Sequence, residues 1–262
     1  MIGSRAFLIV AFLAAALVPL AAQGQGRGSR QPPRADFGQA LPGPGLSVAF
    51  HGNAACASIA SPYGSPTRYD GSPRAVGGGQ GSTHGGIDLS LAEGTPLLAV
   101  APGVVFSTGE GGLLEGIFLW IAHLPERTGL GFAFLSKYQH LSERPKLDKG
   151  TPVGLGQPVA SSGRTGTVGG YYGASGYPHL HLTLRAVADG KRALLSGDGG
   201  EFRINGDSVL MDPLTIYVPD LRSPQDAPGL PAERKRVVAG YVDANGLVRP
   251  GESKAVWPVA CP

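Results

Sequence analysis

The stretch HGGIDLSLAEGTPLLAVAPGVV, residues 84–105, sets short apolar runs between glycine and proline residues. Runs of this kind, rich in branched apolar residues and bounded by turn-forming residues, are typical of β-strands. The same pattern continues along the chain and predicts strands at residues 47–50, 95–100, 104–107, 117–122, 132–135, 159–162 and 180–186. Because the intervals between the runs are too short and too rich in glycine for crossover helices, antiparallel pairing is favoured. We therefore expect an all-β fold, an antiparallel twisted sheet or sandwich with long Gly-rich loops.

The first 45 residues differ in composition from the rest of the chain. Residues 1–22 carry Arg5 near their start and continue as an apolar run of about 14 residues. This pattern is typical of a secretory signal peptide, and the run is shorter than the roughly 20 residues of a membrane span. Residues 23–45 hold few large apolar groups and are expected to form a flexible linker or arm. We expect an exported protein, periplasmic or secreted, with no membrane span after signal cleavage.

The remaining chain is long enough for one compact domain with additions. We expect that domain over residues 46–216 and a C-terminal extension, residues 217–262, packed on it. In the extension, the turn sequence Ala244-Asn245-Gly246 lies between two apolar runs and predicts a terminal hairpin of residues 237–242 with 247–248. Cys56 and Cys261 form either one disulfide that clamps the two ends or two separate thiols, and export favours the disulfide.

The charge of the chain restricts its partners. The formal net charge is +3, and no block of five or more like charges indicates a nucleic-acid partner. The excess of positive charge is either an ordinary solvated surface or a weak attraction to acidic cell-wall polymers. We expect a monomer.

The histidines are the main indication of chemistry. Five of the six lie in three short parts of the chain: His84, then His123 with His140, then His179 with His181. On a strand, residues two apart share a face, so His179 and His181 are predicted to point to one side while Leu180 enters the core. A catalytic zinc ion takes three protein ligands and leaves a fourth position for water. His84, Asp88 and one of the final pair of histidines satisfy that count.

These motifs occur in an order that can be compared with known families. An H-x-G-x-D motif at residues 84–88 is followed by Gly-Thr-Pro-Leu at 94–97, Tyr138-Gln-His-Leu141, Gly163-Arg-Thr-Gly166, Pro178-His-Leu-His-Leu182 and Asp212-Pro-Leu214. Over residues 82–215 this order resembles the lysostaphin-type (LytM-type) zinc metalloendopeptidases, a family of peptidoglycan hydrolases. The resemblance implies a metallopeptidase core of the duplicated hybrid motif type.

The resemblance also implies roles for the site residues. It assigns one zinc ion per chain to His84, Asp88 and His181. It places His140 and His179 beside the water on the metal, with His179 as the first choice of base. His140 would then stabilise the transition state or relay a proton, and the two roles are interchangeable at this point.

The activity implied is zinc-dependent hydrolysis of peptide bonds in the stems or cross-bridges of bacterial peptidoglycan. Two alternatives stay open. One is a non-catalytic member of the same fold that binds cell wall or regulates another hydrolase. The other is an active peptidase whose substrate is a protein.

Residues 167–177 depart from the family pattern. They insert Tyr171, Tyr172 and Tyr177 among glycines where the family usually has a short link, which leaves substrate recognition open.

The remaining residues near the motifs have weaker assignments. Tyr138 is expected to share a strand face with His140 and to line the cleft. His123 makes either a structural hydrogen bond or a substrate contact, and it is left out of the catalytic set. His51 matches no motif and is expected at the surface.

Overall fold

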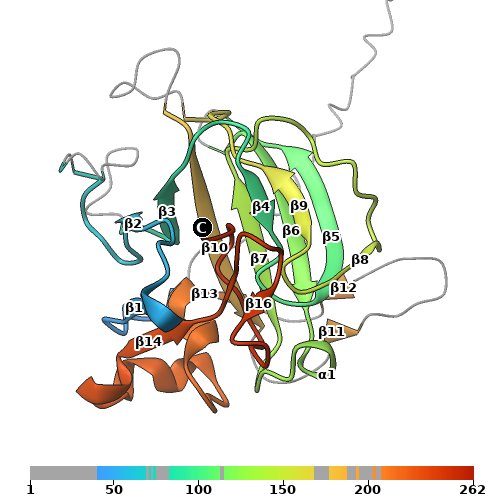
Figure 1. Cartoon of the computed structure of the whole chain (residues 1–262). Coiled ribbons are helices and arrows are strands. Elements are labelled where there is room, and N and C mark those ends of the chain that lie inside the picture. Colours follow the sequence, from blue (N-terminus) through green and yellow to red (C-terminus); the bar gives the residue numbers. More distant parts are fainter. Residues whose placement is uncertain are drawn as a thin grey trace, which may run out of the picture. The chain divides into compact units, whose positions relative to one another are not determined.

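The computed structural model describes residues 40–68, 71, 73–74, 83–112, 115–167, 177–187, 193–194, 203–204 and 208–262 (Figure 1). Contacts divide the chain into Met1–Ala35 and Asp36–Pro262, and only the second unit contains described residues. The predicted signal peptide, most of the predicted arm, and Tyr171 and Tyr172 lie outside the described residues.

The regular elements of the described residues are mostly short strands. The strands are β1 Ser47–Phe50, β2 Ile59–Ser61, β3 Ile87–Ser90, β4 Pro96–Leu98, β5 Gly103–Glu110, β6 Ile117–His123, β7 Phe134–Gln139, β8 Pro152–Val153, β9 Pro158–Ser161, β10 His179–Val187, β11 Ala193–Leu194, β12 Arg203–Ile204, β13 Ser208–Met211, β14 Arg236–Ala239, β15 Tyr241–Val242 and β16 Val248–Arg249. The helical segments are α1 Pro125–Thr128 and the 3-10 turns His51–Asn53, Pro213–Tyr217, Pro224–Gly229 and Ala232–Arg234. In the described part of the chain, no helix has the length and apolar character needed to cross a bilayer.

One antiparallel sheet carries the site. Its strands follow the order β2-β3-β10-β7-β6-β5-β8, and β13 pairs with β10 beside β3. Every pairing in this eight-stranded sheet is antiparallel. The predicted all-β, antiparallel fold is therefore confirmed.

A second layer covers one face of the sheet. The antiparallel pair of β4 and β9 lies over β6 and β7 in Figure 1. Tyr138 of β7 joins the two layers, because its hydroxyl donates to the Leu98 carbonyl and accepts from the Val100 amide, both at 2.9 Å. Along β10, Leu180, Leu182 and Leu184 face this layer and are at most 1% exposed. Alternation along β10 thus sends leucines into the core and histidines to the other face.

The C-terminal residues pack against the N-terminal part of the described chain. Cys56 and Cys261 form a disulfide with their Cα atoms 4.5 Å apart. Trp257 is fully buried, and its indole donates to the Ala57 carbonyl at 3.0 Å. The two cysteines thus form the disulfide and are not separate thiols.

The predicted terminal hairpin is only partly correct. β15 and β16 form an antiparallel pair around the expected turn, where Gly246 has a φ of 79°. The preceding run, β14, instead pairs with β1 in parallel. The expectation of antiparallel pairing is wrong for these two strands. They are almost 190 residues apart in sequence, so no tight turn restricts their relative direction.

Candidate metal centre

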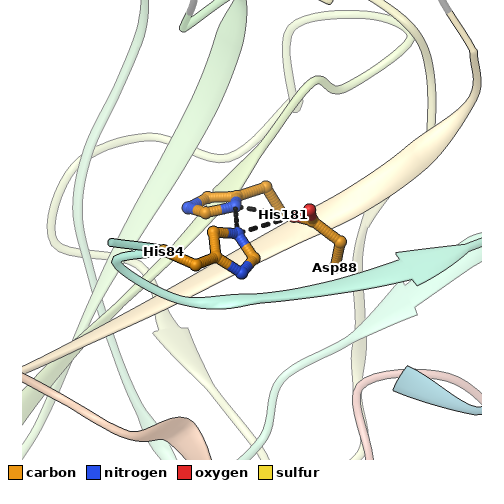
Figure 2. Close-up of side chains that lie close together, drawn as sticks. All are labelled: His84, Asp88 and His181. Atoms are coloured by element: carbon orange, nitrogen blue, oxygen red, sulfur yellow. Dashed lines mark hydrogen bonds and ion pairs between the residues drawn. The ribbon is translucent and has the colours of Figure 1, made fainter. Parts of the chain in front are cut away.

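Two neighbouring strands bring together the three predicted metal ligands (Figure 2). β3 and β10 pair so that Asp88 lies opposite His181, and His84 lies in the turn before β3. His84 Nε2 is 3.0 Å from His181 Nδ1 and 3.1 Å from Asp88 Oδ1. His181 Nδ1 is 2.8 Å from the same carboxylate oxygen. The three residues therefore meet through one atom each, within 4.8 Å of one another.

Gly86 explains the glycine in the H-x-G-x-D motif. A Cβ atom at Gly86 would lie 2.3 Å from the carbonyl oxygen of Leu182 on β10, and 3.1 Å from the His181 ring. Only glycine permits this close approach of the two backbones. The motif thus places His84 and Asp88 against the strand that carries His181.

Hydrogen bonds outside the cluster determine which ring nitrogens face it. His84 Nδ1 is 3.0 Å from the Pro62 carbonyl, which can only accept, so Nδ1 carries the proton and Nε2 presents a lone pair. His181 Nε2 is 2.9 Å from the Thr183 hydroxyl, which accepts as readily as it donates. With its proton on Nε2, His181 presents Nδ1 as a second lone pair beside the Asp88 carboxylate. These three groups are ligands that zinc prefers, and they fit a single ion.

Asp88 supplies the negative charge of the cluster. Burial favours the neutral acid, but the close contacts with His181 and His84 outweigh it and hold the pKa of Asp88 well below its ordinary value. The second carboxylate oxygen, Oδ2, accepts from Arg74 at 3.3 Å. Asp88 is therefore an anion in the folded protein.

His140 and His179 place two more imidazoles beside the cluster. His140 follows the end of β7 in a left-handed backbone conformation, with φ at 63°, and its Nδ1 donates to the Thr165 carbonyl at 2.8 Å. His179 Nδ1 donates to the Tyr177 carbonyl at 3.1 Å, and its Nε2 is 3.9 Å from Asp88 Oδ1. The two ring centroids are 4.5 Å apart. Burial is the main cause that lowers the pKa of each to about 4, so both are neutral at pH 7 with Nε2 unprotonated.

His123 lies apart from this group. Its Nδ1 donates to the Pro102 carbonyl at 3.0 Å, and its Nε2 lies 2.8 Å from the Ser136 hydroxyl. The side chain is fully buried and stacks on Phe134 with the ring centroids 4.4 Å apart. Of the two interpretations, the structural hydrogen bond is the one that the structure contains.

The expected positions of Tyr138 and His51 can be compared with the structure. The expectation that Tyr138 lines the cleft is wrong, because its side chain lies in the core with no exposed surface. β7 ends at Gln139, so the alternation that would pair Tyr138 with His140 does not continue past it. His51 is exposed, as expected.

Two polar residues near the cluster were missed by the motif analysis. Arg74 reaches Asp88, and Ser61 lies 3.3 Å from His84 Nδ1. Arg74 belongs to a Gly-rich stretch that reads only as a loop. No residue spacing in the sequence connects it to Asp88.

Comparison with known proteins agrees with this geometry. Residues 82–193 match the model of peptidase family M23. An uncharacterized metalloprotease of Haemophilus influenzae is 29% identical over 167 residues, which are 64% of this chain and 27% of the relative. The peptidoglycan DD-endopeptidase ShyA of Vibrio cholerae is 34% identical over 101 residues, 38% of this chain and 20% of the relative. The chain thus spans about a quarter or less of the length of these two relatives.

A similar solved structure is the catalytic domain of the antimicrobial peptidase lysostaphin from Staphylococcus simulans. It is 22% identical, with a TM-score of 0.38 over 60% of this chain and 90% of that domain.

Proposed function

We propose that the chain contains a peptidase domain of family M23, whose model matches residues 82–193, and that it is a zinc-dependent endopeptidase that hydrolyses peptide bonds in bacterial peptidoglycan. The observation that carries the proposal is the convergence of two imidazole nitrogens and one carboxylate oxygen, 2.8 to 3.1 Å from one another. The three groups lie on the face of the sheet opposite the apolar core, and two ring lone pairs and a carboxylate at these distances repel one another unless a cation lies between them.

His84, Asp88 and His181 would hold the ion. When bound, zinc acidifies water and polarises the scissile carbonyl as a Lewis acid. The carbonyl of Pro62 and the hydroxyl of Thr183 orient the two ligand imidazoles. Such outer hydrogen bonds fix the tautomer of a ligand histidine and raise its basicity.

His179 and His140 would handle the protons. His179 Nε2 accepts the proton that the attacking water loses and later delivers it to the amine of the leaving peptide. His140 relays that proton or, once protonated, donates to the developing oxyanion. The carbonyls of Tyr177 and Thr165 hold the Nδ1 protons of these rings, which leaves Nε2 as the nitrogen that exchanges protons.

The proposed domain organisation is consistent with an enzyme that is exported to the cell wall. Residues 1–22 are proposed as a signal peptide, 23–45 as an arm, 46–216 as the peptidase domain and 217–262 as its extension. The protein would act outside the cytoplasm as a monomer, in the periplasm or after secretion. The name of the Vibrio cholerae relative supports peptidoglycan as the substrate, in its stem peptides or cross-bridges.

The test is release of soluble muropeptides from purified peptidoglycan. We expect release that a chelator abolishes and added zinc restores, that His181→Ala eliminates, and that the exposed control His51→Ala leaves unchanged. Mass spectrometry of the new peptide ends identifies the bond. A folded protein that binds one zinc ion per chain and releases nothing would contradict the enzyme and favour the wall-binding or regulatory alternative. Cleavage of soluble protein but not of peptidoglycan would contradict the substrate.

A further inference from the structure

Arg74 approaches the metal centre from the segment that precedes His84. Its backbone amide donates to the Pro66 carbonyl at 2.9 Å, and its Nε donates to the Thr67 carbonyl at 3.1 Å. Thr67 and Pro73 form an antiparallel bridge next to it. The side chain is 19% exposed. Pro66 and Thr67 thus hold both the backbone and the side chain of Arg74, with the guanidinium directed at the cluster.

One guanidinium nitrogen reaches two groups of the site. Nη2 of Arg74 donates to Ser61 Oγ at 2.8 Å and to Asp88 Oδ2 at 3.3 Å. Ser61 ends β2, pairs with Asp88 across the strands and is 1% exposed. Ser61 Oγ is also 3.3 Å from His84 Nδ1. Arg74 therefore contacts one predicted ligand directly and a second through a buried hydroxyl.

We infer that Arg74 is a positioning residue that holds the Asp88 carboxylate and, through Ser61, the His84 ring in the geometry that binds the metal. The inference rests on the proposed metal site. With Oδ2 held by Arg74, Oδ1 is the oxygen directed at His84 and His181. The contacts of Arg74 with Pro66 and Thr67 thereby become part of the support of the metal site.

A purely electrostatic role of Arg74 makes the opposite prediction. A guanidinium beside the site repels a divalent cation, so removing its charge would tighten metal binding. A positioning role depends instead on two N–H groups that reach two acceptors in fixed directions. Lysine keeps the charge but is a point donor on a flexible chain and does not reproduce this geometry. The sign of the effect and the behaviour of lysine therefore separate the two roles.

The experiment compares zinc affinity in Arg74→Met, Arg74→Lys and a matched control, Arg68→Met. Arg68 lies in the same turn, and its side chain donates to the Pro73 carbonyl. Zinc dissociation constants are measured by competition with a chromophoric chelator, and the thermal unfolding of each metal-free protein is recorded. We expect both Arg74 variants to bind zinc about 10- to 100-fold more weakly, as loss of an outer-sphere partner typically does. Arg68→Met should match the wild type.

The Ser61→Ala variant tests the inference without changing Arg74 or the segment that carries it. Ser61→Ala removes the hydroxyl but not the Arg74–Asp88 contact, so we expect a smaller loss of affinity than in Arg74→Met. The losses should be less than additive in the double variant, because both act through His84. At saturating zinc, kcat should fall while KM changes little, since Arg74 acts through Asp88.

Three results would overturn the inference: tighter zinc binding in Arg74→Met, wild-type affinity in Arg74→Lys, or an equal loss in Arg68→Met. In each case a wild type that binds zinc through His181 and cleaves peptidoglycan leaves the proposed function standing. A wild type without His181-dependent zinc binding would instead refute the proposed function.

Discussion

His123 and the histidines of the metal centre are carried by the same sheet, and they differ in what their ring nitrogens contact. Both ring nitrogens of His123 are hydrogen-bonded within the core, one to the Pro102 carbonyl and one to the Ser136 hydroxyl. In His84, one ring nitrogen contacts the Pro62 carbonyl and the other faces His181 and Asp88.

Burial does not separate His123 from His140 and His179, and neither does the direction of the pKa shift. His123, His140 and His179 are all buried, and in each of them burial lowers the pKa to about 4. What identifies the site is a second nitrogen that meets other metal-binding groups instead of a hydroxyl or carbonyl. The following three predictions test this distinction.

The largest expected difference is between His179→Ala and His123→Ala. His179→Ala should lower kcat by about 10²- to 10⁴-fold, the usual contribution of a general base, with zinc affinity nearly unchanged. His123→Ala should keep the kcat of the folded fraction but destabilise the protein by about 2–4 kcal/mol. It opens a cavity beside Phe134 and leaves Ser136 without its partner.

Peptidoglycan assays and urea unfolding of the same preparations measure both quantities. A stable His123→Ala protein with a hundredfold lower kcat would place His123 in the reaction and contradict the distinction.

The second prediction concerns acid stability. The pKa of His123 is about 4 when folded and about 6.5 when exposed, so the unfolded chain binds more protons between these values. Stability is therefore fully present above pH 6.5 and is lost as the pH falls towards 4, by about 3 kcal/mol from this residue. His123→Gln should show a shallower loss of unfolding free energy over this window than the metal-free wild type.

The matched control is the same substitution at an exposed histidine, His51→Gln, which separates the effect of losing His123 from that of a histidine-to-glutamine change elsewhere in the chain. Equal slopes in wild type and His123→Gln would show that His123 does not carry this pH dependence.

The smallest expected effects come from the hydroxyls that contact the two groups. Thr183→Val removes the partner of His181 Nε2 and should weaken zinc binding by roughly 10-fold, with little change in the stability of the metal-free protein. Ser136→Ala removes the partner of His123 Nε2 and should cost about 1 kcal/mol of stability with no change in zinc affinity. Chelator competition and urea unfolding give the two numbers, and a reversal of the pattern would refute the comparison.

Much of the fold follows from local patterns in the chain. Apolar runs between glycines and prolines indicate the strands, and alternation correctly separates Leu180 from His179 and His181. The end of β7 could not be predicted from the apolar pattern. The strand continues beyond its apolar residues into polar ones that the sheet buries, including Ser136 and Lys137. The prediction that Tyr138 lines the cleft was wrong because the left-handed backbone of His140 ends the alternation along the strand. No residue type at that point indicates this change of conformation.

The three proposed ligands and the two histidines proposed to handle protons were named through the resemblance of the motif order to a known family, and they remain proposals. For the cysteines, the sequence favoured the disulfide through export but could not establish it. Pairing of Cys56 with Cys261 depends on the approach of two segments 205 residues apart, which no local pattern encodes. The same holds for the parallel contact of β1 and β14.

From the sequence alone came the identities of the proposed site residues and the period-two pattern that sets His179 and His181 on one face of a strand. The tertiary structure decided which groups the ring nitrogens of the histidines contact. It also decided that Tyr138 lies in the core and that Arg74 contacts Asp88. The reason is physical: side-chain direction along a strand is a local property, whereas hydrogen-bond partners are selected by contacts between distant segments of the chain.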